Sequence, residues 1–147
     1  MEFLKHSIDL TILIVLGGMG FFALLFTLER VIFLRRAQRQ LQHYPSVERL
    51  EQACTTNLTT LYIIYSNAPY VGLLGTVVGI MITFYDMGKA SAIDASAIMT
   101  GLSLALYATA LGLLVAIPTL IAYNGLNRKI AVIITNFKHQ ESLEPSA

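Results

Sequence analysis

Apolar residues along this chain fall into three long stretches that contain no charged side chain. The longest runs from Ala95 to Asn127, and the others run from Leu10 to Leu28 and from Pro69 to Tyr85. As an α-helix, the 33 residues of the longest stretch would extend about 50 Å, which exceeds the ~30 Å hydrocarbon core of a bilayer. The pattern therefore predicts an all-α membrane protein with three long transmembrane helices.

The composition supports this class. Of the 147 residues, 55% are hydrophobic and 13% are charged, whereas soluble domains carry about 25% charged residues. The net charge of +1 gives no electrostatic footprint for nucleic acid. Cys54 is the only cysteine, so an internal disulfide is excluded. A single domain of this length, spread over three spans, cannot enclose a wide aqueous pore by itself, which indicates an oligomer or a partner subunit.

Basic residues lie mostly on one side of these spans. Eight of the ten fall between the first two spans or after the third, namely Arg30, Arg35, Arg36, Arg39, Arg49, Arg128, Lys129 and Lys138. The positive-inside rule assigns such segments to the cytoplasm. We therefore expect spans at about 8–29, 68–86 and 95–124, cytoplasmic segments at 30–67 and 125–147, and outer segments at 1–7 and 87–94.

The segments between the spans are predicted to continue the helices. Residues 29–68 have an amphipathic helical pattern that a proline interrupts, and Ser46 is placed to cap the helix that follows. This second helix is expected to begin near Val47 and to run on into the membrane. Pro69 is expected to kink it, because proline lacks the N–H that would bind a carbonyl one turn earlier. Pro118 frees the Leu114 carbonyl in the third span, so a kink or a hydroxyl that binds this carbonyl is expected there, and the alternative is a passive bend.

Small residues recur along one face of the second span and again in the third. They are Gly72, Gly75 and Gly79 in the second span and Gly112 and Ala116 in the third. Small residues let helix backbones approach closely in lipid, where the hydrophobic effect does not drive helices together. We expect these five residues to pack the second and third spans against each other.

Two threonines, Thr76 and Thr109, lie among these small residues. If the second and third spans are adjacent and antiparallel, the two side chains lie within about 8 Å of each other along the helix axis. Their hydroxyls can donate to and accept from water or a carboxylate, and so can line a polar pathway. The alternative is ordinary packing, with each hydroxyl bound to the carbonyl four residues earlier in its own helix.

No Asp, Glu, Lys, Arg or His side chain lies inside the apolar core of any span. Carboxylates within a membrane are the usual mark of proton relays and ion sites. We therefore expect that this chain cannot cycle protons alone and that the titrating carboxylate comes from another subunit. The sequence also contains no nucleophile–base pair, phosphate-binding loop or metal-ligand spacing, and so predicts neither an enzyme nor a cofactor.

Three motifs resemble those of the MotA/TolQ/ExbB proton channel family. They are LERVIFLRRA at 28–37, NAPYVGLLGTVVGIM at 67–81 and LALYATALGLLVAIPTLIAYN at 104–124, in the order that the family has. The three spans and the compact cytoplasmic portion resemble the shorter ExbB-type members. The resemblance implies a homopentameric helical barrel in the bacterial inner membrane, with a periplasmic N-terminus and a cytoplasmic C-terminus.

The resemblance also implies partners and roles for individual residues. The second and third helices would surround the membrane helix of an ExbD-like single-span partner, which carries one essential aspartate. Thr76 and Thr109 match the two family threonines that face this aspartate, and Pro118 matches the family's proline in the third helix. Leu104 is a departure, because many members have a glutamate at this position, and it argues against a proton route through that glutamate.

The resulting prediction is an ExbB-like subunit that uses the proton motive force, with its ExbD-like partner, to energise TonB-dependent transport across the outer membrane. One alternative is a TolQ-like subunit that serves envelope integrity with the same motor. Another is a non-conducting assembly scaffold. A self-contained solute channel is disfavoured, because the apolar cores of the spans contain no Asp, Glu, Lys, Arg or His.

Overall fold

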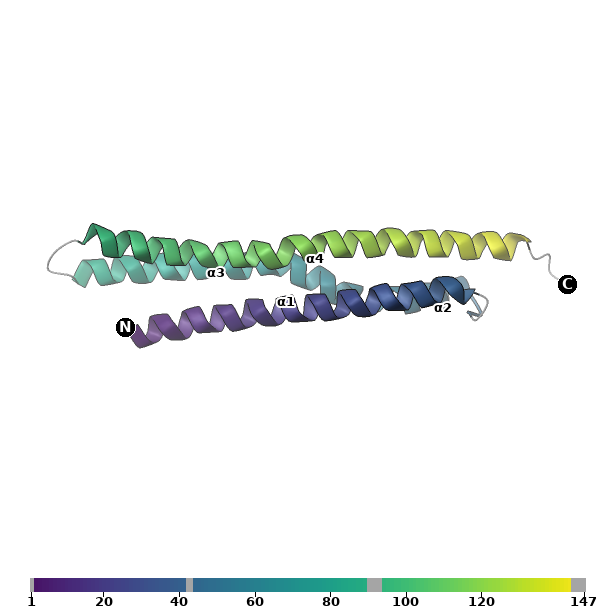
Figure 1. Cartoon of the computed structure of the whole chain (residues 1–147), viewed down its shortest axis with the longest axis horizontal. Helices are drawn as coiled ribbons and strands as arrows, with labels where there is room; N and C mark the ends of the chain where they lie inside the picture. The colour runs from purple at the N-terminus through teal and green to yellow at the C-terminus, as the bar shows by residue number, and fades with distance from the viewer. Residues whose placement is uncertain (1, 42–43, 90–93, 144–147) are drawn as a thin grey trace.

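The computed structural model describes residues 2–41, 44–89 and 94–143, and these residues form four α-helices. The helices are α1 (Glu2–Arg39), α2 (Val47–Thr55), α3 (Leu58–Lys89) and α4 (Ala95–Leu143). Helices α1, α3 and α4 run along an elongated bundle, and the short α2 lies at one end of it (Figure 1). The prediction of an all-α chain with three long apolar helices is confirmed.

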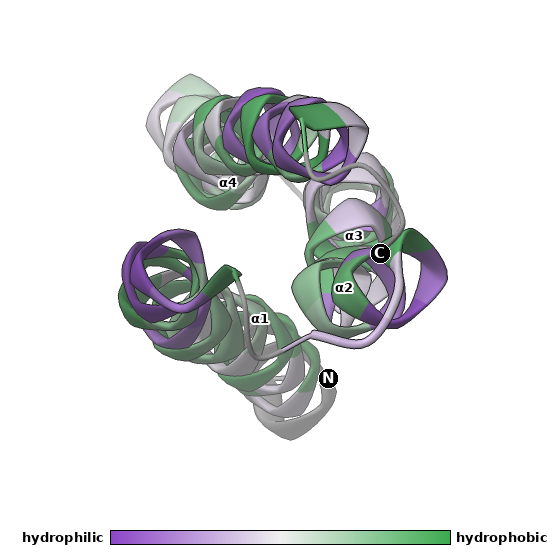
Figure 2. Cartoon of the chain, turned by 90° about the vertical axis from the view of Figure 1, so that its right-hand side faces the viewer, coloured by the Kyte–Doolittle hydropathy of each residue, from purple (hydrophilic) through white to green (hydrophobic). Residues whose placement is uncertain are grey.

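Helices α3 and α4 form an antiparallel hairpin with the most extensive contact between any two helices. α1 packs against both of them, so the three long helices lie at the corners of a triangle when the bundle is viewed end-on (Figure 2). The short α2 packs against α4 and α1. We call the end of the bundle that carries α2 the α2 end.

Three helical stretches are long and apolar enough to cross a membrane, namely Leu10–Arg39, Val47–Lys89 and Ala95–Leu143. Large apolar side chains are exposed along them, including Tyr70 at 70%, Met99 at 72% and Leu114 at 69%. Water-soluble monomers rarely expose contiguous apolar patches of this kind. The surface is therefore that of a membrane protein. Residues 90–93 and 144–147, which belong to the predicted segments 87–94 and 125–147, lie outside the described residues.

One prediction about the second helix is wrong. The helix that begins at Val47 does not run on into the apolar span, because α2 ends at Thr55 and α3 begins only at Leu58. Asn57, between them, has a φ of 63°, a left-handed conformation that asparagine tolerates better than most residues. The hydroxyl of Thr56 donates to the Gln52 carbonyl at 3.0 Å and so binds one of the carbonyls that the end of α2 leaves free.

Other local predictions are confirmed or stay open. Ser46 is the N-cap of α2, where its side-chain oxygen accepts a hydrogen bond from the Arg49 N–H at 3.4 Å, as predicted. Pro69 lies inside α3 and Pro118 inside α4, and both helices continue through their prolines. The kinks at these two positions stay predictions.

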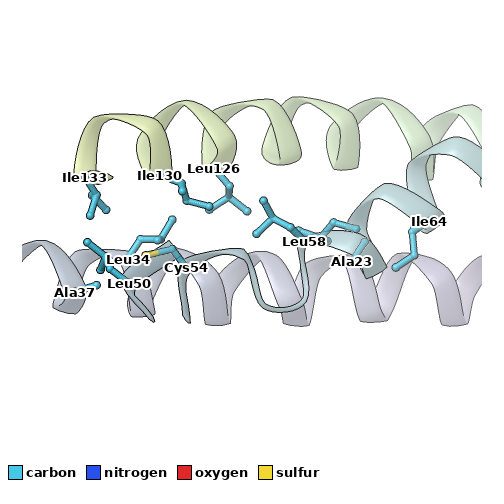
Figure 3. Close-up of a cluster of buried hydrophobic side chains, with 11 residues drawn as sticks. Ala23, Leu34, Ala37, Leu50, Cys54, Leu58, Ile64, Leu126, Ile130 and Ile133 are labelled. Carbon is cyan, nitrogen blue, oxygen red and sulfur yellow. The ribbon is translucent and has the colours of Figure 1, made fainter. Parts of the chain in front are cut away.

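The main hydrophobic core lies at the α2 end, where all four helices contribute buried side chains (Figure 3). Its buried members are Ala23, Leu34, Ala37, Leu50, Cys54, Leu58, Leu61, Ile64, Leu126, Ile130 and Ile133. Side chains from α4 point across to those of α1, and Cys54 of α2 lies between the two helices (Figure 3). This core fixes α2 and the beginning of α3 against α1 and α4.

Leu61 allows a direct test of this core, because its side chain is fully buried on α3. Replacing it with alanine should lower the free energy of unfolding by about 2–5 kcal/mol, since the cavity adds to the lost burial. Ile63→Ala is the control, because Ile63 lies on the same helix but is 52% exposed. Denaturant unfolding in detergent micelles measures both values. Equal losses in the two variants would contradict the assignment of this core.

Candidate functional site at the contact between α3 and α4

The contact between α3 and α4 is built on glycines that bring the two backbones together. A Cβ atom added to Gly72 would lie 2.7 Å from the carbonyl oxygen of Ala108, and one added to Gly112 would lie 2.7 Å from that of Ala68. Both distances are shorter than a Cβ atom tolerates. We call this contact, with its small residues on both helices, the α3–α4 seam.

The seam extends in both directions from this closest approach. A Cβ atom on Gly79 would meet the Ala105 Cβ at 2.8 Å. Gly75 also faces α1, because an added Cβ would lie 2.7 Å from the Ala108 Cβ and 3.0 Å from Cδ1 of Ile12. Towards the α2 end, Ala116 packs in a small buried cluster with Leu16 and Ala68.

Thr76 and Thr109 place their hydroxyls side by side in the seam, in direct hydrogen-bonding contact. The Thr76 hydroxyl donates across the seam to the Ala105 carbonyl at 3.1 Å, and its own helix offers the Gly72 carbonyl at 3.4 Å. The Thr109 hydroxyl lies 3.4 Å from the same Gly72 carbonyl. Thr76 is only 8% exposed. Thr109 is half-buried, so the two side chains form a largely enclosed polar pair between two apolar helices.

This pair differs from the other buried threonines of α3 and α4. Thr83 and Thr119 are also buried, but each donates to the carbonyl four residues earlier in its own helix, at 2.9 Å and 2.7 Å. Among the hydrogen bonds of the described helices, only those of Thr76 and Thr109 join a threonine hydroxyl to another helix. The alternative of purely local hydroxyl bonding therefore describes Thr83 and Thr119 better than it describes the pair.

The chemistry available to the pair is limited to hydrogen bonding. Hydroxyls donate and accept protons in hydrogen bonds but do not ionise near neutral pH. The charge-free stretches on either side offer no carboxylate or imidazole. Within the described residues, no group of three or more His, Cys, Asp or Glu side chains lies close enough to hold a metal ion. The site can polarise or orient a charged group but cannot supply one.

Gly101 belongs to the seam, and Leu104 lies beside it on another side of α4. Gly101 was not singled out from the sequence, yet a Cβ atom there would lie 2.5 Å from the Thr83 hydroxyl oxygen. Its spacing of four from Ala105, a pair of small residues on one face, was the available signal. Leu104 is 58% exposed and lines a small cavity of about 130 Å³ with Ile12, Leu13 and Tyr107, on the side of α4 that faces α1.

Comparison with known proteins decides the family. The model of the MotA/TolQ/ExbB proton channel family matches residues 34–139, which include α2, α3 and most of α4. The chain belongs to this family. The resemblance that the three motifs suggested is thereby confirmed, and the Thr76–Thr109 pair lies within the matched region of this MotA/TolQ/ExbB chain.

Two ExbB proteins match this chain over most of their own length. The chain is 56% identical to the biopolymer transport protein ExbB of Helicobacter pylori strain J99, over 94% of both chains. It is 46% identical to ExbB of Aquifex aeolicus, over 88% of this chain and 86% of that protein. The Tol-Pal system protein TolQ of Pseudomonas aeruginosa is 36% identical over 63% of this chain and 40% of its own length. Together with its three apolar helices, these relatives identify the chain as a multi-pass inner-membrane protein.

Proposed function

We propose that this chain is the ExbB-like subunit of a proton-driven motor that energises TonB-dependent outer-membrane transport. The observation that carries the proposal is the Thr76–Thr109 pair, which is polar and joins two helices where the chain has no ionisable group. Such a pair suits a site that hydrogen-bonds a carboxylate supplied from outside the chain. An ExbD-like single-span protein with a membrane aspartate would supply that carboxylate.

The assembly that we propose is a homopentamer with the α3 and α4 helices around its lumen. The described residues of a single chain form a bundle of three long helices and a short one, too few to surround a wide lumen. In this arrangement the basic segments after α1 and α4 lie in the cytoplasm, following the positive-inside rule, and the N-terminus lies in the periplasm. The spans would be about 8–29, 68–86 and 95–124 of a single domain.

A TonB client is favoured over a Tol client by the coverage of the relatives. The match to ExbB of Helicobacter pylori spans 94% of that protein, whereas the match to TolQ spans 40% of its length. TonB is therefore the proposed third component. With Leu104 at the position where many family members have a glutamate, the proposed route relies on the partner's aspartate together with the two threonines and water.

Proton flux in liposomes tests this proposal. The chain alone and the chain co-purified with its ExbD-like partner are reconstituted, a membrane potential is imposed, and the internal pH is followed with a dye. Flux is expected only with the partner, because the charge-free stretches of this chain contain no carboxylate or imidazole. Changing the partner's membrane aspartate to asparagine should abolish it.

Two outcomes would contradict the proposal. Flux from this chain alone would mean that a proton path exists without the partner's carboxylate. Flux that persists in the aspartate-to-asparagine complex would remove that carboxylate from the mechanism. Liposomes that contain the partner alone are the matched control for leakage.

A further inference from the structure

Two adjacent charged residues at the α2 end of α1, Glu29 and Arg30, contact the break between α2 and α3. Arg30 is 4% exposed, although arginine is rarely buried unless it is paired. We call the segment from Ala53 to Leu58 the α2–α3 corner. The positive-inside rule explains on which side of the membrane Arg30 lies, but it does not explain why its side chain is buried.

Arg30 binds the end of α2. Its Nη1 donates to the carbonyl oxygen of Ala53 at 2.9 Å, and Ala53 lies in the last turn of α2. The last carbonyls of a helix lack partners within the helix and carry partial negative charge, so a guanidinium there is favourable. The centroid of the Phe33 ring lies 4.7 Å from Cζ of the Arg30 guanidinium.

Glu29 binds the beginning of α3. One carboxylate oxygen accepts from Arg30 Nη2 at 2.7 Å, and the other accepts from Nδ2 of Asn57 at 2.8 Å. Asn57 immediately precedes α3 and holds the left-handed turn of the corner. A negative charge near the first turn of a helix is favourable, because the free N–H groups there carry partial positive charge.

The order of the two charges therefore matches the order of the two helix ends. We propose that Glu29 and Arg30 are a positioning pair that holds the α2–α3 corner against α1. The cation of Arg30 binds the end of α2, and the anion of Glu29 binds the residue that precedes α3. α3 continues unbroken from the corner to Thr76 and beyond, so the pair also sets where α3 lies along α1. This inference does not depend on the proposed motor function.

An apolar side chain at position 30 could not form the two hydrogen bonds that Arg30 donates. The Nε atom of Arg30 is buried and has no hydrogen-bond partner within the described residues, which is unfavourable. Replacing buried ion pairs with apolar residues of similar volume is often neutral for overall stability. Arg30 contributes a defined orientation of the corner, because its two Nη atoms bind one particular carbonyl, that of Ala53, and one particular carboxylate, that of Glu29.

Cys54 provides a reporter inside the corner. It is the only cysteine of the chain, and its side chain is fully buried next to Ala53. Burial raises the pKa of the Cys54 thiol, and the charge of Arg30 partly opposes this rise. Removing Arg30 would therefore raise the pKa of Cys54 further and lower the fraction of reactive thiolate while the corner stays intact. A faster reaction with maleimide can then come only from opening of the corner.

The experiment measures the rate of maleimide labelling of Cys54 in the full-length protein in membranes, relative to the rate after denaturation in SDS. Arg30→Met replaces the guanidinium with an apolar side chain of similar length and is expected to raise the relative labelling rate of Cys54 at least about tenfold. Arg35→Met is the matched control, because Arg35 is exposed on the same helix, and it should leave the rate unchanged. Wild-type protection of Cys54 in Arg30→Met would overturn the proposal, because packing alone would then hold the corner.

A second variant tests the order of the charges. Exchanging the two residues, as Glu29→Arg with Arg30→Glu, keeps an ion pair but places each charge at the wrong helix end. Cys54 should label at least as fast in this variant as in Arg30→Met. Restored protection would overturn the proposal, because the order of the charges would then not matter. If the exchanged variant does not accumulate, Glu29→Gln, which keeps the shape of the side chain, should still raise the rate, and an unchanged rate there would equally overturn it.

Discussion

Replacing Gly112 with leucine is expected to separate α4 from α3 and to lower the free energy of unfolding by about 3 kcal/mol, the upper part of the usual range for overpacking. A Cβ atom at this position would lie 2.7 Å from the Ala68 carbonyl oxygen, 3.1 Å from the Gly72 Cα and 3.3 Å from the Gly72 nitrogen. All three are backbone atoms, so no side-chain rotation can relieve the clash. Tight packing of small residues is a main source of helix association in lipid, and losing it removes the reason for the hairpin to close.

Gly125→Leu is the control for this substitution. Gly125 lies on the same helix, and nothing lies within 4 Å of a Cβ atom added there. Unfolding of the two variants by SDS titration in mixed micelles, followed by circular dichroism, gives the comparison. Equal stability of the Gly112 and Gly125 variants would mean that the α3–α4 seam is not as tight as the structure has it.

The spans and their packing faces could be predicted from the sequence, because each depends on a local pattern. Charge-free stretches longer than a bilayer core leave little choice except membrane helices. The spacing of Gly72, Gly75 and Gly79 puts them on one face of a helix whatever that face meets. The structure adds the partner of this face, the small residues of α4 from Ala105 to Gly112.

The α2–α3 corner could not be predicted in the same way. Residues 47–68 contain no glycine or proline that would end a helix, so the pattern favoured one continuous element. The run Thr55, Thr56 and Asn57 is only weakly unfavourable for a helix. What stabilises the break is a contact with Glu29 and Arg30, which lie more than twenty residues earlier in the chain. A single-sequence pattern carries no information about such a contact.

The hydroxyl pair is an intermediate case. Its similar depth in two antiparallel helices followed from counting residues, but direct contact between Thr76 and Thr109 required the close approach that Gly72 and Gly112 allow. A glycine contact alone does not produce such a bond, because Thr83 lies against Gly101 and still donates to its own helix. The glycines and the hydroxyl pair are therefore parts of one feature.

Replacing both Thr76 and Thr109 with valine is expected to reduce proton flux with the ExbD-like partner by about tenfold to a hundredfold. Valine keeps the shape of threonine but cannot hydrogen-bond the partner's carboxylate, and a hydrogen bond to a charged group contributes about 1.5–3 kcal/mol. The fold should change little, because the Gly72 and Ala105 carbonyls keep the N–H groups of their own helices. Flux in liposomes and energised uptake in cells measure the effect.

The matched control is the double variant Thr83→Val with Thr119→Val. These two threonines lie in the same helices and are as buried as Thr76, at 8% and 4% exposed, but their hydroxyls bind only their own helices. Equal loss of flux in both double variants would assign the effect to general packing of the seam. Full flux in the Thr76 and Thr109 variant would remove the hydroxyls from the mechanism. Loss confined to that variant, with its unfolding unchanged, would place the interaction with the carboxylate at this pair, because both double variants remove two hydroxyls but only this one removes hydroxyls that join α3 to α4.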